Sequence, residues 1–376
     1  MSEAVTVLFG GPSPEHDVSI LTGLQAARAL TTAGRSVTGI YWAKTGEFGQ
    51  VRSDLEAAAF LEGGDAIAAA PLRLVAGEGF VASGRLGRPG KAIDTGVVVV
   101  CCHGGPGEDG SLQAMLDLSG ISYAGPSGAG AALGMDKLAF GSVVESAGLP
   151  TLPRAVVDPS RGDAKPEFDP PYIVKPRFGG SSIGIEVVAD WDAAVALASA
   201  SVHLRSGAIV EPWRGDAVDV QVSIRSWPRP ALSPIEKPVR AAGGKGGILG
   251  YADKYVGGEG MASAPRELPA QLPADIERRV IECGEALAPL VGLRGVSRVD
   301  FLWDESAGEL WVNEINTIPG SLSKYLWEAA DPSVTFPQLL NDLIVEATAR
   351  PAMYWSTQGA DGSALRSAGT IASKLG

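Results

Sequence analysis

Short apolar runs that stop at paired glycines alternate with helical segments at the start of the chain. VTVLFGG begins at Val5, and TGVVVVCCHGG begins at Thr95. Between them, residues 17–34 repeat apolar side chains at helical spacing, and SVTGIYWA follows as a second strand. An entirely apolar run such as VVVVCC fits a strand that is covered on both faces, as in a parallel sheet. The pattern predicts an α/β fold whose open, largely parallel sheet fills residues 1–124, with ligand-binding glycine loops at the strand ends.

The character of the chain changes from about Asp136, where the pattern becomes α+β. PYIVKPRFGGSSIGIEVV predicts two strands joined by a Gly/Ser loop, and VSRVDFLWDESAGELWVNEIN predicts a β-hairpin. We therefore expect three parts after the first domain. These are a central subdomain over residues 125–207, a C-terminal subdomain over 208–348 and a tail over 349–376.

Composition narrows the class of protein. A chain of 376 residues with 45% hydrophobic and 20% charged residues fits a globular protein of two or three domains. A net charge of -12 argues against nucleic acid as a general partner, although a local basic pocket could still bind a small anion. No leader sequence and no apolar run of about 18 residues is present, which predicts a cytoplasmic protein without membrane association. The three cysteines, Cys101, Cys102 and Cys283, predict no disulfide framework, and Cys101 and Cys102 are expected to be buried and apolar in role.

The predicted hairpin carries oxygen ligands at its end. Glu314 and Asn316 stand two residues apart, so we expect them to share one strand face with Leu310 and Val312. That face begins apolar and becomes polar only at its tip. If the partner strand brings Asp300 beside them, three oxygen ligands converge without a nearby histidine or cysteine. Such a set suits magnesium.

Two alternatives stay open at this point. Arg298 and Asp300 share a face of the partner strand and could be a structural ion pair instead. The loop KPRFGGSSIG, which follows Lys175, could be a plain flexible turn. It could also direct backbone N–H groups at an anion, although it is not a P-loop because a strand follows it. Together, a lysine strand, a Gly/Ser loop and an acidic hairpin describe a nucleotide site.

An ordered series of motifs resembles the D-alanine–D-alanine ligase family of the ATP-grasp superfamily. The resemblance runs from about Val5 to Ala330. It implies an N-terminal open parallel-sheet (pre-ATP-grasp) domain that supplies substrate residues, followed by a two-part α+β ATP-grasp domain. The motifs are LFGGPSPEHDVSI, HGGPGEDGSLQAMLDLSGISYAG, MDK, YIVKPRFGGSSIG, DKY, RVDF and NEINTIPG.

The resemblance implies an ATP-dependent carboxylate–amine ligase that forms a dipeptide through an acyl phosphate. ATP and Mg²⁺ (or Mn²⁺) would be its cofactors and small amino acids its substrates. A homodimer and a place in peptidoglycan biosynthesis follow from the same resemblance. Two rivals remain: a sibling ligase of secondary metabolism with another acceptor, and an inactive nucleotide-binding module. The second rival is disfavoured because a degenerate site would be expected to lose a magnesium ligand.

The resemblance also implies roles for individual residues. The catalytic residues would be Glu15, Ser181, Tyr255, Arg298 and Gly320. The ATP-binding residues would be Lys137, Lys175, Glu211, Trp213 and Lys254. The metal ligands would be Asp300, Glu314 and Asn316. The substrate-binding residues would be His103, Ser323, Lys324 and Tyr325.

Some of these assignments have simpler alternatives. Glu15 could cap the following helix, and Tyr255 could be a partly buried aromatic residue. The resemblance places Glu211 and Trp213 on an inter-domain hinge, where Trp213 could have a packing role only. The loop 243–260 is the expected lid over the acyl phosphate.

The chain departs from the family pattern at two places. Ala217 stands where the family has a ribose-binding glutamate, and Asp216 or Asp219 could replace that glutamate. Tyr325 stands at the position of the serine that binds the second substrate's carboxylate, directly after Lys324. This change predicts that D-alanine is a poor second substrate. In the alternative, Tyr325 turns outward and its own hydroxyl, or that of a nearby serine, does the family's task.

Overall fold

The computed structural model describes residues 4–61, 70–82, 90–161, 165–239, 265–350, 356–368 and 370. Its first sheet has seven strands in the order β5-β4-β3-β2-β1-β6-β7. The strands are β1 (Val5–Gly10), β2 (Val37–Trp42), β3 (Phe48–Val51), β4 (Ala70–Val75), β5 (Gly79–Ala82), β6 (Val97–Val100) and β7 (Tyr123–Ala124). The strands β2, β1, β6 and β7 pair in parallel, as predicted. The strands β3 to β5 extend the sheet in antiparallel pairs.

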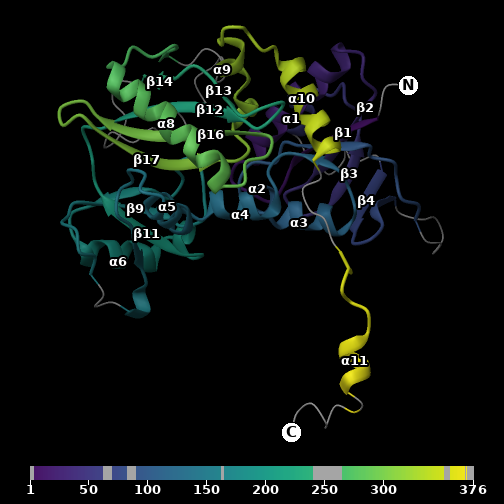
Figure 1. Cartoon of the computed structure of the whole chain (residues 1–376), viewed down its shortest axis with the longest axis horizontal. Helices are drawn as coiled ribbons and strands as arrows, with labels where there is room; N and C mark the ends of the chain where they lie inside the picture. Colours follow the sequence, from purple (N-terminus) through teal and green to yellow (C-terminus); the bar gives the residue numbers. More distant parts are fainter. Residues whose placement is uncertain are drawn as a thin grey trace.

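Helices from both ends of the chain cover this sheet. They are α1 (His16–Thr32), α2 (Gly105–Glu108), α3 (Ser111–Leu118) and α10 (Phe336–Ala349). Helix α10 contacts α1, β6 and β7, and its buried leucines belong to the same core as the valines of β6. A capping box between Thr335 and Gln338 begins α10. The last long helix therefore completes the core of the N-terminal sheet (Figure 1).

A second sheet, of order β10-β9-β11-β8, carries the Gly/Ser loop. Its strands are β8 (Ala155–Val157), β9 (Tyr172–Pro176), β10 (Glu186–Val188) and β11 (Ala208–Pro212). The helices of this region are α4 (Gly128–Met135), α5 (Lys137–Ser146) and α6 (Trp191–Ala200), with short 3-10 turns η1 (Ala57–Phe60), η3 (Pro159–Arg161) and η4 (Val202–Leu204) elsewhere. Helices α3 and α4 run between the two halves of the molecule in Figure 1.

The third sheet, of order β13-β12-β16-β17, carries the acidic hairpin, and α8 covers it (Figure 1). Its strands are β12 (Val218–Arg225), β13 (Ala231–Leu232), β16 (Val296–Asp304) and β17 (Glu309–Asn316). A two-stranded sheet pairs β14 (Lys237–Pro238) with β15 (Arg266–Glu267). The remaining elements are α8 (Ala274–Leu290), η6 (Gly320–Ser323), α9 (Lys324–Glu328) and α11 (Ser363–Ala368).

A β-bulge near the end of β17 corrects one expectation. Val312 pairs with Phe301, but Glu314 pairs with Asp300, so Asn313 is an extra residue in the ladder. The extra residue reverses the alternation of faces. Glu314 therefore does not share a face with the apolar side chains that precede the bulge, and that expectation was wrong.

In the part of the chain that the structure describes, no helix is both long and apolar enough to cross a membrane. The three cysteines are unpaired, and Cys101 and Cys102 are buried, as predicted; Cys283 is buried as well.

Candidate active site

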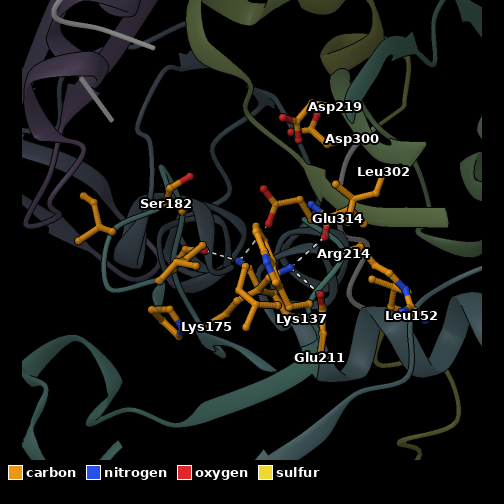
Figure 2. A pocket seen from close by; sticks show the side chains of 18 of the residues that line it. Lys137, Leu152, Lys175, Ser182, Glu211, Arg214, Asp219, Asp300, Leu302 and Glu314 are labelled. Carbon is orange, nitrogen blue, oxygen red and sulfur yellow. Dashed lines mark hydrogen bonds and ion pairs between the residues drawn. The ribbon is translucent and has the colours of Figure 1, made fainter. Parts of the chain in front are cut away.

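A pocket opens between the second and third sheets (Figure 2). Residues of β9, β11, β12, β16, β17 and the Gly/Ser loop line it. Of the residues predicted to bind ATP or metal, six line this pocket. They are Lys137, Lys175, Glu211, Trp213, Asp300 and Glu314. The fold thus brings together residues from four predicted motifs and from the segment that contains Glu211 and Trp213.

The two lysines reach the pocket from different elements. The Nζ of Lys175 on β9 lies 2.6 Å from Glu211 Oε2 and 3.0 Å from Asn313 Oδ1. Lys137 begins α5, and its Nζ lies 3.2 Å from Glu314 Oε2 and donates to the carbonyl of Gly179. Both side chains are buried. Each ammonium group is therefore held by oxygen atoms at the pocket wall, facing the space where phosphates would lie.

Glu211 on β11 is the most buried carboxylate of this group, and two cations neutralise it. Besides Lys175, Arg154 donates to its Oε1 at 2.8 Å. Burial alone would raise the pKa of Glu211, but the charges of Lys175 and Arg154 hold it below the ordinary value. Arg154 also donates to the backbone carbonyls of Lys137 and Asn313. One guanidinium group thus connects both lysines and the end of β17.

The Gly/Ser loop is tied to the N-terminal domain. Ser181 donates a hydrogen bond to Glu15 Oε1. A Cβ on Gly180 would lie 2.7 Å from Glu15 Oε2, so a side chain there would displace the Glu15 carboxylate. Ser181 and Ser182 both adopt positive φ, at 53° and 58°. Glu15 precedes α1 but makes no side-chain capping bond, so the simpler alternative for this residue was wrong.

The acidic hairpin places its ligands on paired strands. Arg298 donates to both oxygens of Asp300, at 2.6 and 2.7 Å, so the ion pair considered above exists. Asn316 Nδ2 lies 3.1 Å from Asp300 Oδ2, and Glu314 stands opposite Asp300 in the ladder. In Figure 2, Asp300 and Glu314 lie on the same side of the pocket.

The donor set of this hairpin fits magnesium. Among the described residues, no three His, Cys, Asp or Glu side chains cluster as a metal site. The predicted trio instead offers two carboxylates and an amide, whose oxygen and nitrogen exchange places by a half-turn. Magnesium usually takes one or two protein carboxylates and completes its shell with water and phosphate oxygens.

His103 is buried away from solvent. Its Nδ1 lies 2.7 Å from the Ile318 carbonyl and its Nε2 lies 2.8 Å from Thr22 Oγ1. Burial lowers the pKa of His103 to about 4, so the ring is neutral at physiological pH. Glu108 lies nearby, and burial together with the charge of Glu15 raises its pKa to about 7. Both ring nitrogens of His103 are therefore engaged by protein atoms.

The predicted acceptor residues point in different directions. Lys324 Nζ lies 5.4 Å from the centre of the Phe336 ring, over the start of α10. Tyr325 donates to Glu236 Oε2 at 2.8 Å. Ser323 is fully buried, and its hydroxyl has no hydrogen-bond partner among the described residues.

Tyr325 does not turn outward. Its ring is half-buried beneath the guanidinium of Arg266, with 4.3 Å between the guanidinium carbon and the ring centre. Burial and the adjacent charge of Glu236 raise the pKa of Tyr325, so its hydroxyl stays protonated. Because that proton is directed at Glu236, the hydroxyl is already committed as a donor.

Of the other predicted residues, some lie in the described part of the chain and some lie outside it. Trp213 and Asp219 line the pocket, whereas Ala217 is buried in the protein. Lys254, Tyr255 and the expected lid 243–260 lie outside the described residues.

Sequence reasoning missed several side chains that organise this site. They are Thr22, Glu108, Arg154, Glu236 and Asn313. Glu108 stands inside the motif HGGPGEDG, so a signal for it was present. Arg154 and Glu236 stand alone between prolines and apolar residues, and only the fold shows their partners.

Two family models match this chain. Residues 4–126 match the family model for the D-Ala–D-Ala ligase N-terminus, and residues 143–345 match the model for the C-terminus. A D-alanine–D-alanine ligase of Methylobacterium sp. (strain 4-46) is 33% identical over 379 residues, covering 94% of this chain and 93% of the relative. The corresponding enzyme of Arthrobacter sp. (strain FB24) is 32% identical, covering 92% of this chain and 94% of the relative.

Solved structures share the fold. The D-Ala:D-Ser ligase VanG of Enterococcus faecalis superposes with a TM-score of 0.74 at 24% identity, covering 92% of this chain and 100% of that chain. The D-alanine–D-alanine ligase of Helicobacter pylori superposes with a TM-score of 0.72 at 25% identity, covering 91% of this chain and 99% of that chain.

Proposed function

This chain belongs to the D-alanine–D-alanine ligase family, and we propose that it joins the carboxylate of D-alanine to the amine of a second D-amino acid. It is an ATP-dependent dipeptide ligase of the ATP-grasp type, as its relatives are. The family does not favour the rival readings of a secondary-metabolism ligase or an inactive module. One observation carries the proposal: two buried lysines, a Gly/Ser loop and an acidic strand pair line a single pocket.

In the first step, the substrate carboxylate attacks the γ-phosphorus of ATP, and the bond to the ADP oxygen breaks. Lys137 and Lys175 offset the charge that spreads over the phosphoryl oxygens. The loop that contains Ser181 covers the phosphates, while Glu211 and Trp213 hold the adenine at the hinge. Lys254 and Tyr255 have family roles beside the γ-phosphate and Ser181.

Asp300, Glu314 and Asn316 would hold Mg²⁺, or Mn²⁺ in its place. The ion would neutralise charge on the phosphate oxygens of ATP. This assignment is supported by the two carboxylates and one amide that meet at the strand ends.

In the second step, the amine of the second substrate attacks the acyl carbonyl, and orthophosphate leaves. The negative charge that develops on the carbonyl oxygen would be met by Arg298 and by the backbone N–H of Gly320. Glu15 holds the Gly/Ser loop through its hydrogen bond with Ser181, which supports the family role of this pair. Water must be excluded while the acyl phosphate exists, since it hydrolyses readily.

A product assay tests this function. Purified protein with ATP, Mg²⁺ and a panel of D- and L-amino acids should release ADP and orthophosphate, with a dipeptide detected by mass spectrometry. The panel identifies the second substrate at the same time. Formation of AMP and pyrophosphate would exclude an acyl-phosphate mechanism, and absence of any amino-acid-dependent phosphate release would reject ligase activity.

The family resemblance also supports a homodimer in the cytoplasm that acts on small molecules, without nucleic-acid or membrane partners. Light scattering on the purified protein would test the dimer directly, and a monomer at micromolar concentration would contradict it.

A further inference from the structure

The backbone of Ile318 is held at both its N–H and its carbonyl by the segment that follows β6. The Ile318 N–H donates to Glu108 Oε1 at 3.0 Å, and the Ile318 carbonyl accepts from His103 Nδ1 at 2.7 Å. Glu108 Oε2 accepts a further hydrogen bond from the Gly104 N–H at 2.9 Å. Ile318 itself lies midway between Asn316 at the tip of β17 and Gly320. The peptide that follows the metal-binding strand is thus fixed by two side chains of the N-terminal domain.

Thr22 on α1 extends this set of contacts to the next turn. Its Oγ1 lies 2.8 Å from His103 Nε2 and accepts from the Ser321 N–H at 3.1 Å. Because His103 must donate from Nδ1 to a carbonyl, its Nε2 accepts the Thr22 hydroxyl proton. Every donor then meets an acceptor, from Ser321 through Thr22 and His103 to Ile318. This series of hydrogen bonds is complete only when the imidazole is neutral, which agrees with the low pKa of His103.

The three side chains are buried and the loop that they hold is strained. Thr22, His103 and Glu108 are 1%, 3% and 8% exposed. The loop that they contact has positive φ at three consecutive non-glycine residues, Ser321 to Ser323, at 49°, 51° and 53°. Each such residue costs free energy, and the conformation persists only when surrounding contacts fix it. Ile318, three residues before this strained turn, and Ser321, its first residue, receive those fixing contacts through their backbone atoms.

We propose that Thr22, His103 and Glu108 are positioning residues that hold the segment 318–321 so that the Gly320 N–H faces the reacting carbonyl. The inference rests on the proposed ligase function and deepens it. None of the three side chains needs to touch substrate for this role. Loosening them should slow attack by the second substrate more than phosphoryl transfer to the first, because Gly320 serves only the second step.

The test compares two steps in one reaction. Exchange of the β,γ-bridging oxygen of labelled ATP reports reversible acyl-phosphate formation, and mass spectrometry reports the dipeptide. Thr22→Val keeps the side-chain shape but removes the hydroxyl between His103 and Ser321. We expect the ratio of oxygen exchange to dipeptide to rise at least about tenfold, since small displacements of a reacting geometry cost that much or more.

Thr6→Val is the matched control. Thr6 is also 1% exposed, and its hydroxyl donates to the Thr95 carbonyl at 2.8 Å. It is the second residue of β1, near the N-terminal end of that strand. The control loses a buried hydroxyl of the same kind without touching the segment 318–321. Its ratio of exchange to dipeptide should equal that of the wild type.

A second pair of variants keeps the proposal testable if Thr22→Val folds poorly. The amide nitrogen of asparagine can occupy the place of histidine Nδ1, whereas that of glutamine can occupy the place of Nε2. His103→Asn retains a donor for the Ile318 carbonyl and should keep the exchange ratio within about threefold of the wild type. His103→Gln should raise the ratio at least about tenfold.

The proposal is overturned if both steps slow equally in Thr22→Val, if Thr6→Val produces the same rise, or if the two His103 variants do not differ. These outcomes require an active wild type. A wild type that forms neither dipeptide nor labelled-exchange product would instead reject the proposed function, so the two failures are distinguishable.

Discussion

At the scale of single residues, Glu314 combines two contacts that matter for catalysis. It stands opposite Asp300, and its carboxylate meets the Lys137 ammonium at 3.2 Å. We predict that Glu314→Ala lowers phosphate release at least about a hundredfold, because a metal ligand and the partner of a phosphate-binding lysine are both lost. The melting temperature should change by only a few degrees, because the side chain is half-buried at a strand end.

Glu309→Ala is the control for this prediction. Glu309 begins the same strand and is exposed. Its removal should leave phosphate release unchanged. Release at the wild-type rate from Glu314→Ala at ordinary magnesium concentrations would refute the metal assignment.

Tyr325 gives a second prediction at this scale. Its hydroxyl donates to Glu236, so it does not offer its proton to a substrate carboxylate. We predict that the wild type uses D-alanine poorly as second substrate and that Tyr325→Ser raises kcat/KM for D-alanine in that role about tenfold or more. Tyr325→Phe keeps the bulk without the hydroxyl and should bring no gain. Efficient D-alanyl-D-alanine formation by the wild type at millimolar D-alanine would contradict the prediction.

Local motifs and distant partners differ in what the sequence could reveal. Glu15 and Ser181 belong to recognisable motifs, and the fold brings them into hydrogen-bond contact. Arg154 and Glu236 carry no such pattern. Their importance arises from partners on other elements, such as Glu211 and Tyr325, and proximity of that kind is a property of the tertiary fold.

At the scale of elements, helix α4 and the end of β17 approach closely at Gly134. A Cβ on Gly134 would lie 2.6 Å from the Thr317 side chain. We predict that Gly134→Ala shifts the strand end that carries Asn316 and raises the Mg²⁺ concentration needed for half-maximal activity several-fold. The usual gain of about 1 kcal/mol from replacing a helical glycine by alanine should not appear in the melting temperature.

The first residue of the same helix provides the control. A Cβ on Gly128 would find its nearest atom at 3.6 Å, an ordinary contact. Gly128→Ala should therefore leave the magnesium dependence unchanged. If the two variants behave alike, close packing of α4 on β17 does not position the metal ligands.

Regular patterns predicted most elements, and irregular ones were missed. The parallel strands β1 and β6 follow from short apolar runs before glycines. The antiparallel strands β3 and β5 are four residues each; β3 is interrupted by a glycine and β5 begins with one, so their pattern is weak. The bulge at Asn313 could not be predicted from the sequence. The residues that follow it include polar side chains, and a polar side chain can lie on either face of a strand, so the pattern of apolar and polar residues does not reveal the extra residue.

At the scale of the whole molecule, the buried imidazole couples stability to pH. The pKa of His103 falls from 6.5 to about 4 on folding. A group with a lower pKa in the folded state binds protons more readily when unfolded. The neutral His103 ring therefore has its full effect on the free energy of unfolding above pH 6.5. As the pH falls toward 4, the free energy of unfolding decreases by at most about 3 kcal/mol on account of this residue.

We therefore predict that the urea midpoint of the wild type falls more steeply between pH 7 and pH 4.5 than that of His103→Asn. The comparison of the two proteins cancels the common contribution of other groups, such as His16, whose pKa burial also lowers. Parallel pH profiles would show that charging this ring is not part of acid unfolding.

The two hydrogen bonds that fix the Ile318 backbone have a consequence for recombination between related genes. The backbone that it fixes and the side chains that fix it are about 200 residues apart, since the contact between His103 and Ile318 spans 215 positions. A chimera that takes its first half from one relative and its second half from another inherits the two partners from different parents. Such hybrids would meet at a mismatched seam. Exchanging Thr22, His103 and Glu108 together with the segment 318–321 would keep the seam intact.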